Sequence, residues 1–149
     1  MQATAVIERR EASQSKLRAL LESRTETLSL LNELAAMRPF KPEHDMQVLL
    51  QEFCESLVDY TASAHFQLYK FIEEGTERRA SVKELASAVY PRIAAATQVI
   101  LDFNEKYDCG DHCNNLTNLS EDLSQLGEIL AGRIQDEDQL IDLLIQERD

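Results

Sequence analysis

The sequence predicts an all-α protein, an antiparallel up-down bundle of four long helices with a kink at Pro91 in the third. Its 149 residues include only four glycines and three prolines, so few positions favour turns or end a helix. Apolar residues recur three and four positions apart over long segments, which is the spacing of one helix face. No segment alternates like a β-strand. The length fits one domain over residues 1–149, of which residues 1–12 are polar enough to fray.

The first two helices are delimited by residues that end a helix. The first is expected over residues 4–37, because the following segment, Arg38-Pro39-Phe40-Lys41-Pro42, has two prolines three positions apart. The second is expected over residues 43–74, because Gly75 suits the left-handed conformation in which many helices end.

The third and fourth helices follow from similar signals. Ser81-Val82-Lys83-Glu84 has the pattern of a capping box, so the third helix should run over residues 81–107. Pro91 interrupts its apolar periodicity and predicts a kink rather than an end. The fourth is expected over residues 116–146, where leucine and isoleucine come close to a heptad seam. Long helices joined by short connections must return antiparallel.

The second helix carries two neighbouring stripes of different character. The stripe expected to face the core consists of Cys54, Val58, Thr61, His65 and Leu68. The stripe expected to bind a partner, offset by one residue, consists of Asp59, Ala62, Ser63, Phe66 and Tyr69. A carboxylate beside two aromatic side chains on one surface is a plausible docking patch. These residues lack catalytic or metal-ligand spacing, so the helix is expected to serve recognition.

Charged residues also fall on the seam of the fourth helix. Arg133 and Glu137 form an i,i+4 pair, and Asp138 follows. If His65 faces this pair across the bundle, His65, Arg133 and Glu137 form a buried polar network, which stabilises only when every member is satisfied. The alternative is that these charges lie in water at the edge of the bundle.

The net charge of −12 is unevenly distributed. Residues 1–41 hold seven basic and five acidic residues, so the rest of the chain holds eight basic and 22 acidic residues. An acidic surface repels nucleic acid and anionic membranes and attracts basic partners. Direct binding to nucleic acid or membrane is therefore not expected. The charge could also serve only to keep the protein soluble.

Enzymatic chemistry is not expected either. No histidine has a glutamate three residues before it, which excludes the usual di-metal site of a four-helix bundle. No Gly-x-Ser-x-Gly or glycine-rich phosphate loop is present. Cys109, His112 and Cys113 offer zinc-binding atom types or a redox pair, but a fourth metal ligand is not evident, so incidental cysteines are a third interpretation. We expect no catalytic residues and no cofactor.

The odd number of cysteines, three, and the absence of a secretory or membrane-spanning apolar run predict a cytoplasmic protein. The oligomeric state is left open by the sequence, with a monomer favoured. An exposed Phe66 would suit a contact between two copies as well as a contact with another protein.

Several motifs together resemble one known family. The block Phe53-Cys54-Glu55-Ser56-Leu57-Val58-Asp59-Tyr60, followed by His65-Phe66 and Tyr69, resembles the signature of the Rsd/AlgQ family, the regulators of sigma D. Arg38-Pro39-Phe40 resembles the break after the family's first helix, and Tyr90-Pro91 resembles an aromatic-proline pair in its third. Arg133 with Glu137-Asp138 resembles a motif near the family's end.

The resemblance implies an anti-sigma factor that binds the housekeeping sigma factor and holds it away from core RNA polymerase, in stationary phase. The implied contact is the basic helix-turn-helix domain of sigma that binds the −35 promoter element. Asp59 and Phe66 correspond to exposed interface residues of the family, and Ala62 to a common serine. A transcriptional regulator or scaffold for another basic protein is the alternative, as is a metal- or redox-responsive regulator acting through Cys109, His112 and Cys113.

The chain departs from the family pattern at two places. Ala62-Ser63-Ala64 stands where relatives have Ser-Ala-Gly, which removes a glycine that allows close approach and moves a hydroxyl by one position. Arg18-Ala19-Leu20-Leu21 stands where relatives have an Asp-Arg-Trp-Leu block. The affinity for sigma is therefore expected to differ from that of relatives.

Overall fold

Helices make up nearly all of the computed structural model, which describes residues 2–70, 80–108 and 115–145, with side chains described over 17–70, 80–108 and 115–143. The elements are α1 (Gln2–Ala35), α2 (His44–Ala64), η1 (His65–Tyr69), α4 (Ala80–Tyr107) and α5 (Leu119–Ile145). Element η1 is a π-helical turn that continues α2. The described ranges contain no strand. The predicted all-α bundle is confirmed.

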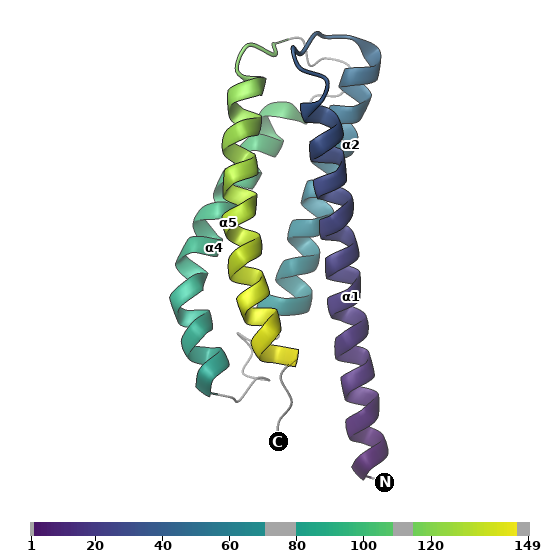
Figure 1. Ribbon diagram of the computed structural model, residues 1–149, viewed down its shortest axis with the longest axis vertical. Helices are drawn as coiled ribbons and strands as arrows, with labels where there is room; N and C mark the ends of the chain where they lie inside the picture. Colours follow the sequence, from purple (N-terminus) through teal and green to yellow (C-terminus); the bar gives the residue numbers. More distant parts are fainter. Residues whose placement is uncertain (1, 71–79, 109–114, 146–149) are drawn as a thin grey trace.

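The helices lie side by side along one long axis (Figure 1). Helix α1 packs against α2, α4 packs against α5, and α2 also contacts α4. In Figure 1 the chain ascends α1, descends α2 and η1, ascends α4 and descends α5, so that the amino end of α1 and the carboxyl end of α5 lie at the same end of the molecule. No described helix is long and apolar enough to cross a membrane.

The core fills the space between the helices with leucines and aromatic side chains. Each fully buried leucine or phenylalanine contributes about 1.5–3 kcal/mol relative to an exposed one. The largest fully buried side chains include Leu20 and Leu34 of α1, Leu50, Phe53, Leu57 and Tyr60 of α2, Ile100 of α4, and Leu119, Leu123 and Leu126 of α5. Phe53 and Phe103 meet edge to face, with ring centroids 5.9 Å apart. Helices α2 and α4 therefore share this core.

Polar contacts fix the relative positions of neighbouring helices. Thr27 of α1 and Ser56 of α2 form a buried hydroxyl pair, with their Oγ atoms 2.8 Å apart. After α1 ends, Arg38 donates to the hydroxyl of Ser124 on α5 at 2.9 Å. Buried polar groups require such partners, so these contacts favour one register of α1 against its neighbours.

Helix α4 runs without interruption through Pro91. The kink predicted at this residue stays a prediction. The next residue, Arg92, contacts Asp136 of α5 through two hydrogen bonds of 3.2 and 2.9 Å. This bidentate pair is the strong geometry for arginine and carboxylate, and it joins α4 to α5 at the level of Pro91.

Candidate functional site

The core stripe of α2 agrees only in part with the expected one. Cys54 and Leu68 are fully buried as expected, but the other buried members, Phe53, Leu57, Tyr60 and Ala64, lie on the stripe one residue earlier. Val58 and His65, which were expected to face the core, are exposed. Stripes one residue apart differ by only about 100° around a helix, and the earlier stripe buries the larger side chains. Burying Phe53 and Leu57 gains more than burying Thr61 and His65.

The opposite face of α2 and η1 carries the other predicted residues. Asp59 and Ala62 are exposed, and Ser63 is half-buried. Phe66 leaves 61% of its surface in water, the largest exposed fraction among the large apolar side chains that the structure describes. The His65 ring meets it edge-on at 5.0 Å, and the Lys70 ammonium lies 5.4 Å from its centre. Phe66 is thus the large apolar side chain of this face that is most available for contact with another molecule.

Tyr69 does not belong to this exposed face. The prediction that it would is wrong, because only 5% of its surface is exposed. Its hydroxyl donates to Glu137 of α5 at 2.6 Å. The difference arises from the π-helical geometry of η1, which changes the direction in which residue 69 points.

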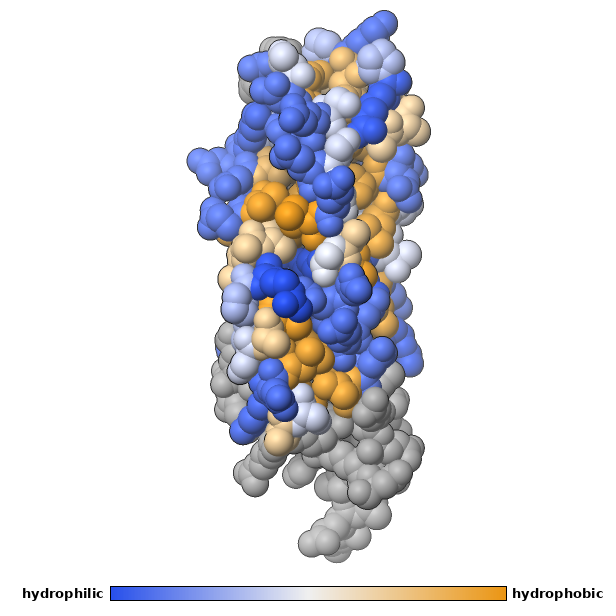
Figure 2. All heavy atoms as spheres, turned by 60° about the vertical axis from the view of Figure 1, so that its left-hand side comes forward, coloured by the Kyte–Doolittle hydropathy of each residue, from blue (hydrophilic) through white to orange (hydrophobic). Residues whose placement is uncertain are grey.

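A groove of about 540 Å³ lies between α2 with η1 on one side and α4 on the other. Three large exposed apolar side chains line it, namely Val58, Phe66 and Leu101, which are 39%, 61% and 48% exposed. Tyr69, Thr97 and Arg133 also line it. Figure 2 turns the α4 side of the bundle forward and shows patches of apolar side chains between polar ones. An apolar groove with a few polar groups is the usual form of a binding site.

Acidic residues accompany the apolar ones. Glu55 lies one helical turn before Asp59, and both are exposed. On α4, the exposed carboxyl groups of Asp102 and Glu105 follow Leu101. Most of the negative charge beside the groove comes from α2, which carries four acidic residues and no lysine or arginine, whereas α4 carries three of each sign. The acidic side of α2 next to the apolar side chains suits a basic partner.

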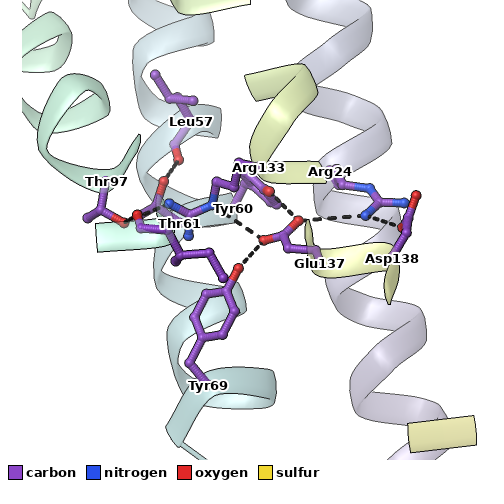
Figure 3. Close-up of polar contacts among 10 residues, drawn as sticks. Arg24, Leu57, Tyr60, Thr61, Tyr69, Thr97, Arg133, Glu137 and Asp138 are labelled. Atoms are coloured by element: carbon purple, nitrogen blue, oxygen red, sulfur yellow. Dashed lines mark hydrogen bonds and ion pairs between the residues drawn. The ribbon is translucent and has the colours of Figure 1, made fainter. Parts of the chain in front are cut away.

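Behind the groove, the carboxylate of Glu137 is fully buried and joins three helices (Figure 3). Its Oε1 accepts the hydroxyl of Tyr60 at 2.5 Å, and its Oε2 accepts that of Tyr69 at 2.6 Å. The Arg24 guanidinium of α1 lies 3.6 Å from Oε1 and pairs with Asp138 at 2.9 Å. A buried carboxylate needs this many partners to offset the loss of its hydration.

Arg133 is the buried cation of the same network, 2% exposed. It pairs with Glu137 at 3.4 Å and donates to the hydroxyl of Thr97 on α4 at 2.7 Å. Its guanidinium lies 5.6 Å from the ring centres of both Tyr60 and Tyr69. Burial opposes its charge, but the tyrosines and Glu137 hold its pKa above the ordinary value.

His65 is not part of this network. The structure brings Arg133 and Glu137 together as the sequence predicts, but the expected histidine points away and its place is taken by Tyr60 and Tyr69. Tyr60, Arg24 and Thr97 also belong to the network, and their part in it was not predicted. Tyr60 lies three residues after Leu57 and four before Ala64, and this spacing is the signal that could have placed it in the core.

The network should make stability depend on alkaline pH. Burial first, and then the charge of Glu137, raise the pKa of Tyr60 and Tyr69 above the ordinary value of 10.0. Below pH 10.0 both tyrosines are protonated in the folded and in the unfolded protein, so their hydroxyls contribute fully to the free energy of unfolding. As the pH rises further, the tyrosines of the unfolded protein ionise and this contribution declines. We expect the wild type to lose more free energy of unfolding between about pH 9 and pH 11 than a Tyr60→Phe/Tyr69→Phe variant. Urea unfolding at both pH values measures this, and equal losses would contradict it.

No group of three or more potential metal ligands occurs among the side chains that the structure describes. The three candidates of the sequence, Cys109, His112 and Cys113, lie outside the described residues. Cys54 is buried, and burial raises the pKa of its thiol to about 12, so it stays protonated and poorly reactive.

Comparison with known proteins supports a common origin over nearly the whole chain. Residues 1–145 match the family described as "Regulator of RNA polymerase sigma(70) subunit, Rsd/AlgQ". The "Regulator of sigma D" of Yersinia enterocolitica serotype O:8 is 35% identical over 128 residues, covering 81% of this chain and 75% of that protein. The protein of the same name from Enterobacter sp. (strain 638) is 33% identical over 131 residues, covering 84% and 77%. No solved structure matches.

Proposed function

Because the chain belongs to the Rsd/AlgQ family of regulators of the RNA polymerase sigma(70) subunit, we propose that it binds sigma through the Asp59–Phe66 face of α2 and η1 and the groove beside it. Its membership makes it a regulator of transcription that acts through binding to a sigma subunit and not through catalysis. The observation that supports this surface most strongly is Phe66, 61% exposed at the edge of an apolar groove.

The apolar side chains of the groove suit an anchor contact. Aromatic residues at the centre of an interface, surrounded by contacts that exclude water, supply most of the binding energy. Phe66 can provide such an anchor, while Val58 and Leu101 flank the space into which a partner side chain or helix would enter. The small side chain of Ala62, between Asp59 and Phe66 on the same face, leaves room for close approach.

The charge of the chain favours one part of sigma as the partner. Residues 42–149 have a net charge of −14 from eight basic and 22 acidic residues, and Glu55, Asp59, Asp102 and Glu105 are exposed on the helices that border the groove. The domain of sigma that binds the −35 promoter element is a basic helix-turn-helix, and opposite charges accelerate and orient association.

In this proposal the protein sequesters the housekeeping sigma factor in a one-to-one complex. Occupying its −35-binding domain would compete with the contacts that this domain makes to core polymerase and to promoter DNA, as the family resemblance implies for stationary phase. RNA polymerase as the target implies action in the cytoplasm. The negative charge also disfavours direct contact with DNA or RNA. We infer a monomeric regulator, which light scattering can check.

Titration calorimetry of the full chain with the isolated −35-binding domain of its own sigma factor tests the proposal. We expect a one-to-one complex whose affinity falls as salt is raised, because exposed charges contribute to it. Absence of binding at tens of micromolar, roughly the weakest affinity that would support sequestration, would contradict the proposal. If the affinity does not change with salt, the proposed contribution of charge to binding is wrong, whereas binding itself is still supported.

A further inference from the structure

Tyr69 occupies a position that a regular α-helix could not give it. Five residues of α-helix separate it from buried Ala64, a rotation of about 140° that would turn it away from the core. Instead, the backbone N–H of Lys70 donates to the carbonyl of His65, five residues earlier, and the wider turn of η1 accommodates one more residue. Tyr69 therefore points inward, 5% exposed.

Contacts with three residues hold Tyr69 in this position. Its hydroxyl donates to Glu137 Oε2 at 2.6 Å. Its backbone carbonyl accepts the hydroxyl of Tyr90 at 3.3 Å, and the two tyrosine rings meet edge to face at 6.0 Å. The guanidinium of Arg133 lies 5.6 Å from its ring centre. The hydrogen bond to a charged, fully buried carboxylate is the strongest of these contacts.

Phe66 lies in the same π-helical turn. In a regular α-helix, residues seven apart lie on nearly the same face, so Asp59 and Phe66 would be aligned. Asp59 belongs to the regular part of α2, whereas Phe66 belongs to η1. The wider turn therefore sets the angle between the carboxylate and the ring. Tyr69 and Phe66 both line the groove, from its inner and outer sides.

We propose that Tyr69 is a positioning residue for sigma binding, because its hydrogen bond to Glu137 holds the π-helical turn that orients Phe66 relative to Asp59. The residue acts from the core and needs no contact with the partner. The inference rests on the proposed function, in which Phe66 contacts sigma. Irregular turns of this kind inside helices often occur at functional sites.

The structure supplies a matched pair of variants. Tyr69→Phe and Tyr60→Phe each remove one hydroxyl that donates to the same carboxylate, at 2.6 and 2.5 Å, but Tyr60 lies in the regular part of α2. We expect Tyr69→Phe to weaken binding of the full chain to the −35-binding domain about tenfold, roughly the effect of one charge-assisted hydrogen bond. Tyr60→Phe should weaken binding less than about twofold. It should nevertheless lower the free energy of unfolding about as much as Tyr69→Phe does.

A second readout needs no partner. Amide hydrogen exchange at Lys70, whose N–H forms the π-helical hydrogen bond, should accelerate in Tyr69→Phe and stay near the wild-type rate in Tyr60→Phe. Urea unfolding of both variants shows whether they remain folded.

The outcomes separate the positioning role from the proposed function. Equal affinity losses in the two variants, or an affinity of Tyr69→Phe equal to that of the wild type, would overturn the positioning role while leaving sigma binding intact. A wild-type protein that does not bind the −35-binding domain would overturn the proposed function and, with it, this role.

Discussion

Glu137→Ala is expected to lower the free energy of unfolding by about 3–5 kcal/mol, the cost of leaving a buried charge without its partner. Glu137 is fully buried, and the Arg133 guanidinium that it neutralises is only 2% exposed. The substitution also removes the acceptor of the Tyr60 and Tyr69 hydroxyls. Three buried groups thus lose a partner at once. Urea unfolding followed by circular dichroism measures the change.

Glu128→Ala is the matched control, since Glu128 lies on the same helix with its side chain exposed. Surface substitutions of this kind change stability by no more than about 0.5 kcal/mol. If Glu137→Ala costs less than about 1 kcal/mol, water or a rearranged Arg133 satisfies the network, and the account of a stabilising buried carboxylate is wrong.

Phe66→Ala is expected to weaken binding to the −35-binding domain by about 1–3 kcal/mol, roughly ten- to a hundredfold, as for other aromatic anchors. Because 61% of its surface is exposed, the ring packs little in the monomer, and the free energy of unfolding should hardly change. Asp59→Ala should weaken binding over a similar range, with an effect that shrinks at high salt. Calorimetric titration gives the affinities.

Val48→Ala provides the control for Phe66→Ala. Val48 is 40% exposed on α2, the helix that η1 continues, but does not line the groove. It should leave the affinity unchanged. If Phe66→Ala binds like the wild type, the ring is not an interface anchor. The same conclusion follows if the substitution lowers the free energy of unfolding by as much as it weakens the free energy of binding.

The sequence predicts the helices well because apolar periodicity and turn residues determine them locally. Residues 81–107 are expected to be helical, and α4 spans Ala80–Tyr107. Residues 4–37 are expected for the first helix, and α1 spans Gln2–Ala35. The observed ends of the helices differ slightly from the expected ones, because apolar periodicity does not show where a helix frays or is capped.

The functional face was harder to predict from the sequence. The exposure of Asp59, Ala62 and Phe66 agrees with the expectation, although their role in binding stays a prediction. His65 and Tyr69 are misplaced because a 3.6-residue period leaves adjacent stripes ambiguous and contains no sign of a π-helical turn. Arg24, Thr97 and Glu137 lie on three different helices. Their proximity depends on how these helices pack, which the spacing of residues along the sequence does not show.

Titration of the isotope-labelled full chain with the unlabelled −35-binding domain of sigma, followed by NMR, shows whether sigma binds the Asp59–Phe66 face and the groove beside it. It reports binding and location together. We expect the largest shift changes at Asp59, Ala62 and Phe66 of the exposed face and at Leu101 across the groove. The outward residues of α1 should change little. Shift changes confined to α1, or none at all, would contradict the account.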